Sequence, residues 1–153
     1  MTETRSDQVS IPVLLRAARG CYAQAIATRL AAAGIEDLPR SGAFVVGGLA
    51  LRGRDAVDHL RGLGVSKQAV SQLIDTLVLR GYLDREVDPA DRRRMTIELT
   101  DRGRAVADEI GEAVGRVEAE LASMITPDEL AGLRAGLAAL ARIRERSAPA
   151  GPA

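Results

Sequence analysis

The chain has 153 residues, with 21 basic and 21 acidic side chains, one Cys and one His. This length suffices for one compact protomer or one half of an intertwined dimer, and a single Cys excludes a disulfide framework. One Cys and one His cannot form a cluster with metal-ligand spacing, and no apolar run reaches the length of a membrane span. We therefore expect a cytoplasmic protein with no metal, no cofactor and no membrane partner.

The charges are unevenly distributed along the chain. Residues 52–104 hold 11 basic and 9 acidic side chains, whereas residues 105–130 hold 1 basic and 7 acidic side chains. The cations thus gather on the central segment, which is typical of a segment that contacts nucleic acid.

In chain order, residues 1–10 are polar and are expected to be disordered. Residues 11–35 follow with apolar side chains at helical spacing, such as Leu14 and Leu30, among many short Ala side chains, which predicts a closely packing helix. A second helix is expected at residues 41–51. It contains three glycines, each costing on the order of 1 kcal/mol relative to Ala, so it should be weak. A short helix over residues 55–62 carries His59, interpreted first as a surface residue.

A two-faced helix is predicted from Ser66 to Arg80. Ser66 is a strong N-cap, Gly64 suits the preceding turn, and Gly81 suits the stop. Val70, Leu73, Ile74 and Leu77 form one apolar stripe. The opposite arc carries a cation, amides and hydroxyls, which suit base edges and phosphates, although any surface helix presents a polar face to water. These residues are Lys67, Gln68, Ser71, Gln72, Asp75 and Thr76.

An arginine-tipped hairpin comes next. Leu83 and Val87, then Met95, Ile97 and Leu99, have the period-two pattern of two strands. The intervening loop contains turn formers and three consecutive arginines, which folding alone does not explain. A phosphate backbone or the minor groove would use them, and a solvated charge run is the alternative. The loop comprises Asp88, Pro89, Ala90, Asp91, Arg92, Arg93 and Arg94.

Two further helices are expected within residues 101–146. Thr100 caps the first, and Thr126 to Glu129 form a capping box at the start of the second. With residues 11–35, these helices present more apolar surface than the central segment can cover, so we expect a partner subunit. Residues 147–153 are rich in Pro and Ala and are expected to be a disordered tail.

The segment from Leu63 to Arg104 resembles the MarR family of bacterial transcriptional regulators. The family's wing pattern, Asp-Pro-x-Asp-x-Arg followed by Leu-Thr-x-x-Gly, is present as Asp88, Pro89, Asp91, Arg93, Leu99, Thr100 and Gly103. The resemblance implies that Arg93 enters the minor groove, oriented by Asp91, with Arg92 and Arg94 beside it. It also implies that Ser66, Lys67, Gln68, Ser71 and Gln72 belong to the DNA-facing helix.

The expected fold is mainly α with a small β-hairpin wing. A winged helix-turn-helix module at residues 38–100 would be flanked by dimerisation helices at 11–35 and 101–146, as one structural domain per protomer. The expected function is that of a homodimeric repressor of a pseudo-palindromic operator. The resemblance further implies a small-molecule effector between the dimer helices and the DNA module, lined by Arg16, Arg19, Tyr22 and His59.

Three alternatives are weighed against this interpretation. A winged-helix module could bind protein and not DNA. An enzyme would need a catalytic constellation that the sequence lacks. Cys21 could be a redox sensor, but its surroundings lack the Cys-Phe-x-x-Tyr pattern of peroxide-sensing relatives, so we favour a small buried thiol.

Overall fold

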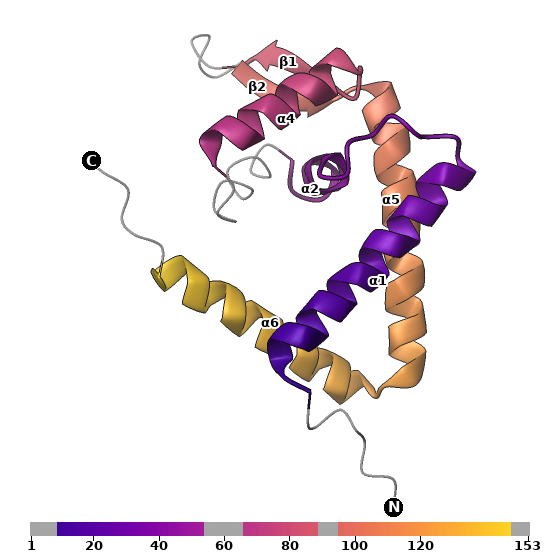
Figure 1. Cartoon of the computed structure of the whole chain (residues 1–153), viewed down its shortest axis with the longest axis vertical. Helices are drawn as coiled ribbons and strands as arrows, with labels where there is room; N and C mark the ends of the chain where they lie inside the picture. The colour runs from indigo at the N-terminus through magenta and orange to yellow at the C-terminus, as the bar shows by residue number, and fades with distance from the viewer. Residues whose placement is uncertain (1–8, 54–65, 89–94, 148–153) are drawn as a thin grey trace, which may run out of the picture. The chain divides into compact units, whose positions relative to one another are not determined.

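The computed structural model describes residues 9–53, 66–88 and 95–147, and it confirms a mainly helical chain with one antiparallel hairpin (Figure 1). The short helix expected at residues 55–62 and the turn at Gly64 lie outside the described residues. No helix in the described ranges has both the length and the apolar character needed to cross a bilayer. The elements are α1 (Ile11–Ala32), α2 (Gly42–Arg52), α4 (Lys67–Leu79), β1 (Leu83–Val87), β2 (Met95–Leu99), α5 (Asp101–Met124) and α6 (Pro127–Ser147).

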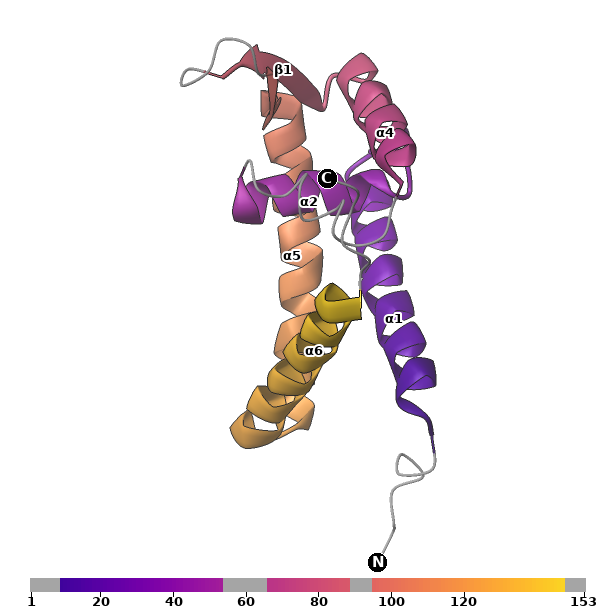
Figure 2. The ribbon, with the colours of Figure 1, turned by 90° about the vertical axis from the view of Figure 1, so that its left-hand side faces the viewer.

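The chain divides into two compact units, one ending at Val117 and one beginning at Glu118. The core of the first unit lies where α2 crosses α5 and meets the last turn of α4 (Figure 2). Burying these side chains stabilises the unit by roughly 1.5–3 kcal/mol for each large one. They come from α2 (Val45, Val46, Leu49), α4 (Leu77), the start of the hairpin (Tyr82, Leu83) and α5 (Val106, Ile110).

The glycines of α2 have a packing role that helix propensity does not predict. A Cβ on Gly42 would lie 3.0 Å from Cδ2 of Leu77, and one on Gly47 would lie 3.3 Å from Cγ2 of Ile110. Both glycines therefore allow α2 to approach its neighbours closely. This close packing stabilises α2, which helix propensity alone predicted to be weak.

Helix α1 joins the first unit mainly through its C-terminal half. Leu30 is buried, and Arg29 forms ion pairs with Glu109 and, at 2.6 Å, with Glu112 of α5. The hydrogen bond from Arg29 to Glu109 raises the pKa of the guanidinium. The first two turns of α1 are exposed, and Cys21 is exposed as well. The prediction of a buried thiol was wrong for the single chain, because no described element covers that face of α1.

The second unit contains the end of α5 and the whole of α6. The predicted capping box is present, since Thr126 N–H donates to Glu129 Oε2 (2.8 Å) and Glu129 N–H donates to Thr126 Oγ1 (3.3 Å). The hydrogen bonds that the Thr126 amide and hydroxyl donate to the Glu129 carboxylate lower the pKa of Glu129. None of the described residues of the second unit is buried. The apolar side chains along α6 are two-fifths to one-half exposed: Leu133, Leu137, Leu140 and Ile143.

Candidate nucleic-acid interface

Helix α4 presents a polar face whose side chains are uncommitted. Its N-cap is formed by Ser66 Oγ, which accepts the N–H of Ala69 at 3.1 Å. Val70, Ile74 and Leu77 are buried, which directs the polar arc outward. In the described part of the chain, the exposed side chains on that arc make no intramolecular hydrogen bond or ion pair: Lys67, Gln68, Ser71 and Gln72. The hydrogen-bond donors and acceptors of this arc are therefore available to bind another molecule.

Two residues predicted on the same arc are engaged within the protein. Thr76 Oγ1 donates to the carbonyl of Gln72 at 2.9 Å. Asp75 pairs with Arg85 of β1, which neutralises a carboxylate on a face that would otherwise repel phosphate. The sequence placed Asp75 and Thr76 correctly on the helix but could not show that they are occupied.

The hairpin has two different faces. Leu83 pairs with Leu99 and Arg85 with Ile97, so these residues share the face that meets α4 and the core. Asp84 lies opposite Glu98 in the register, and Glu86 shares their face because side chains alternate along a strand. One face of the hairpin is therefore acidic and unsuited to a phosphate backbone.

The predicted wing residues connect the two strands at their far ends. The sequence places Asp91, Arg92, Arg93 and Arg94 between Asp88 and Met95, and all four lie outside the described residues. Their assignment to DNA remains a prediction.

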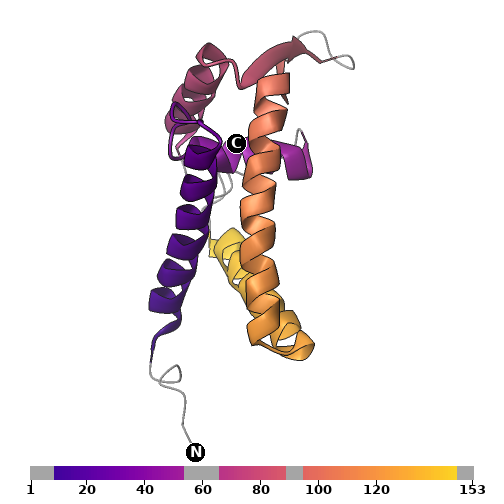
Figure 3. The same cartoon turned by 90° about the vertical axis from the view of Figure 1, so that its right-hand side faces the viewer.

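The base of the hairpin shows why the chain needs Thr100 and Gly103. Thr100 N–H donates to the carbonyl of Tyr82 (3.1 Å), and Thr100 Oγ1 accepts the N–H of Gly103 (2.9 Å), which caps α5. Figure 3 shows the hairpin at the N-terminal end of α5. A Cβ on Gly103 would lie only 2.1 Å from the Tyr82 carbonyl oxygen. The Leu-Thr-x-x-Gly pattern thus closes the hairpin against the first turn of α5.

A polar network that no local sequence pattern indicates lies beside this junction. The Tyr82 hydroxyl donates to Asp37 Oδ1, and Arg102 NH2 donates to both carboxylate oxygens of Asp37 at 2.9 and 3.0 Å. The hydrogen bond from Tyr82 and the charge of Arg102 lower the pKa of Asp37. Burial and the bond to Asp37 raise the pKa of Tyr82. Asp37 and Arg102 are 65 positions apart, so no local pattern signals their pairing.

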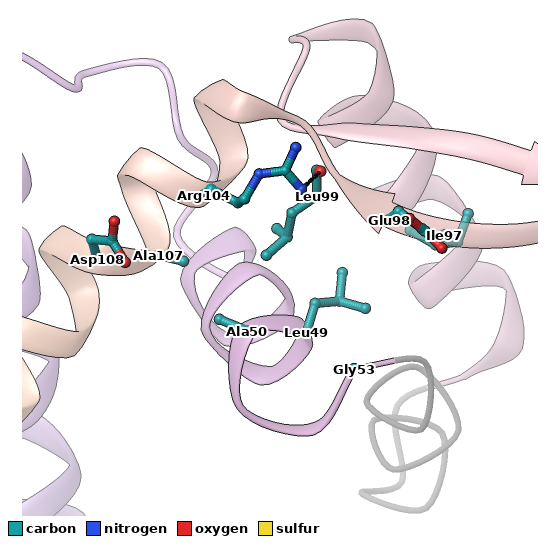
Figure 4. A pocket seen from close by; sticks show the side chains of 9 residues that line it. All are labelled: Leu49, Ala50, Gly53, Ile97, Glu98, Leu99, Arg104, Ala107 and Asp108. Atoms are coloured by element: carbon teal, nitrogen blue, oxygen red, sulfur yellow. Dashed lines mark hydrogen bonds between the residues drawn. The ribbon is translucent and has the colours of Figure 1, made fainter.

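The residues predicted to line a ligand pocket are only partly described. Arg16 and Arg19 are exposed on α1, with the Arg19 guanidinium 5.7 Å from the ring centre of Phe44, and Tyr22 is half-buried. His59 lies outside the described residues. A pocket of ≈ 510 Å³ lies elsewhere, between α2, β2 and the first turns of α5 (Figure 4). Its walls are apolar at Leu49, Ala50, Ile97, Leu99 and Ala107 and charged at Glu98, Arg104 and Asp108.

Comparison with known proteins gives agreement in both sequence and fold. A model of the MarR family matches residues 60–94. The multiple antibiotic resistance protein MarR of Escherichia coli (strain K12) is 33% identical over 72 residues, 46% of this chain and 50% of that protein. This part of the chain is therefore similar to the MarR family.

Solved structures show a likeness in fold over most of the chain. The PcaV transcriptional regulator from Streptomyces coelicolor, in complex with its natural ligand, has a TM-score of 0.64 at 21% identity, covering 88% of this chain and 93% of that chain. The S. aureus MepR–DNA complex has a TM-score of 0.67 at 22% identity, covering 87% and 97%. At these identities the likeness shows the fold. The chain spans about half the length of the curated relatives it matches.

Proposed function

We propose that this chain is a sequence-specific DNA-binding transcriptional regulator that represses its target as a homodimer on a pseudo-palindromic operator. The observation that carries the proposal is the exposed, uncommitted arc of α4, with two amides, a hydroxyl and a cation. Gln can bond adenine in a bidentate manner, Lys suits guanine, and Ser can serve base or phosphate. The relation to MepR, whose structure with DNA has the same fold, supports this assignment.

The hairpin supplies the second half of the proposed interface. Its acidic face, with Asp84, Glu86 and Glu98, would be turned away from the phosphates. The loop arginines, with Arg93 in the minor groove and Asp91 orienting it, would then add affinity with little sequence information.

The proposed dimer rests on apolar surface that a single chain leaves uncovered. Ile11, Val13 and Leu14 on α1 are exposed, as is the stripe of α6 described above. A two-fold partner would bury these helices and present two α4 helices to half-sites about one DNA turn apart, roughly 34 Å. Such a regulator acts in the compartment that holds DNA, the cytoplasm in bacteria.

Ligand control is the finer part of the proposal. PcaV was solved with its natural ligand and MepR with ethidium bromide, which supports an effector for this chain as well. We assign the effector site to the α1 side, with Arg16, Arg19, Tyr22 and His59. The assignment would be supported if an effector lowers the DNA affinity of the wild type but not that of Arg19→Ala.

The test of DNA binding separates α4 from the hairpin. A duplex selected by the wild-type protein from a randomised library, and a scrambled duplex, are titrated by fluorescence anisotropy at several salt concentrations. Gln68→Ala or Gln72→Ala should cost roughly 1–3 kcal/mol on the selected duplex and little on the scrambled one. Arg93→Ala should weaken both and reduce the salt slope by about one counterion.

Matched controls exist elsewhere in the chain. Gln24→Ala removes an exposed amide from α1, and Arg116→Gln removes an exposed cation from α5. Neither should change the ratio of the two affinities. If the wild-type protein selects no duplex and Arg93→Ala changes nothing, the protein-interaction alternative becomes the better explanation.

A further inference from the structure

One arginine at the start of α5 joins three separate segments of the first unit. Arg102 NH1 donates to the carbonyl of Arg80 at 2.6 Å, and NH2 donates to Asp37 and, at 3.1 Å, to the Tyr82 hydroxyl. Its guanidinium carbon lies 4.3 Å from the centre of the Tyr82 ring. Arg80 adds a second tie, because its side chain donates to the backbone carbonyl of Asp37.

Each of these contacts fixes a different part of the proposed DNA-binding module. Asp37 lies in the connection between α1 and α2, Arg80 is the C-cap of α4, and Tyr82 precedes β1. Arg102 therefore holds the end of α4 and the beginning of the hairpin against the first turn of α5.

Arg102 is far from the side chains that would read DNA. Helix α4 has 13 residues, so its C-cap lies about 20 Å from its N-terminus. Over that length, a tilt of about 10° at the Arg80 end would displace Lys67 and Gln68 by about 3 Å. Hydrogen bonds to base edges do not tolerate such a displacement.

We propose that Arg102 is a positioning residue that sets the orientation of α4 and the hairpin on α5 and thereby determines DNA specificity. The proposal rests on the proposed DNA-binding function. A guanidinium is required because one planar group must serve a carboxylate, a backbone carbonyl and an aromatic ring together. A lysine ammonium can reach one or two of these partners only.

The experiment compares Arg102→Gln, Arg102→Lys and the matched control Arg116→Gln with the wild type. The probes are the selected and scrambled duplexes, titrated by anisotropy at several salt concentrations, with circular dichroism to verify folding. Arg102→Gln should weaken binding to the selected duplex about tenfold and to the scrambled duplex less than about twofold, with an unchanged salt slope. The affinity of Arg102→Lys for the selected duplex should lie between those of Arg102→Gln and the wild type. Arg116→Gln should bind both duplexes as the wild type does.

The outcomes distinguish this proposal from the function on which it rests. If Arg102→Gln weakens both duplexes equally and reduces the salt slope, Arg102 contacts phosphate directly and the positioning role is refuted. Wild-type affinity in Arg102→Gln would refute it too, while leaving DNA binding intact. Failure of the wild type to prefer any duplex would overturn both. Should Arg102→Gln not fold, Asp37→Asn removes the ion pair with little change of shape and carries the same expectations.

Discussion

Gly103→Ala is a small substitution for which the structure predicts a large cost. The added Cβ would lie 2.1 Å from the carbonyl oxygen of Tyr82, whereas Cβ atoms in proteins essentially never come within 3.0 Å of such an atom. The first turn of α5 would therefore have to move about 0.9 Å away from the base of the hairpin. The obstacle is backbone, so no side-chain rotation relieves it.

The energetic cost follows from the bonds that this movement stretches. Thr100 N and Thr100 Oγ1 each lie 3.1 Å from the Tyr82 oxygen, and a shift of that size takes both beyond hydrogen-bond range. Each bond contributes about 1 kcal/mol, and the residual crowding costs about 1–3 kcal/mol. Ala offsets about 1 kcal/mol through its better helix propensity. The free energy of unfolding should fall by about 2–4 kcal/mol.

Urea denaturation followed by far-ultraviolet circular dichroism measures this change. Gly111→Ala is the matched control, because Gly111 lies on the same helix and a Cβ there would meet no heavy atom within 4 Å. That variant should be unchanged or more stable by up to about 1 kcal/mol. If both variants gain stability equally, the close approach of Gly103 to Tyr82 is not a constraint and the reasoning fails.

Three further predictions concern the terminal helices and the polar network. Arg at both Leu133 and Leu137 should yield monomer or aggregate and abolish DNA binding, and a well-folded wild-type monomer at micromolar concentration in light scattering would refute the dimer. Cys21→Ser should leave DNA affinity unchanged, and peroxide should not release the wild-type complex; a peroxide effect that vanishes in the variant would show redox sensing. Because its pKa is lowered in the folded protein, Asp37 stabilises the fold above about pH 4, and this contribution is lost as the pH falls through the folded pKa. Asp37→Asn should therefore be less stable than the wild type at neutral pH and lose less stability on acidification, as measured by urea denaturation at several pH values.

The sequence predicted those features that depend on local pattern. The limits of α4, the two strands, the Thr100 cap and the capping box at Thr126 are each specified within a few residues, and all are present. The outward arc of α4 was likewise predictable, because helical periodicity fixes which side chains oppose Val70 and Ile74.

Features that depend on distant contacts could not be predicted in this way. Gly42 and Gly47 were interpreted by propensity alone, since their neighbours Leu77 and Ile110 come from other parts of the chain. The exposure of Cys21 depends on which element covers α1, and that is a tertiary property. No local sequence pattern indicates the role of Arg102, because its partners become neighbours only when the fold is complete.

The ion pair between Asp75 and Arg85 has a consequence for engineering. A designer who transplants a foreign α4 into this chain, to redirect it to another operator, would normally exchange the helix alone. If the foreign helix lacks a carboxylate at the position of Asp75, Arg85 loses its partner and becomes an extra cation beside the groove, adding affinity without selectivity. The unit to be exchanged is thus the helix together with the first hairpin strand, residues 66–87.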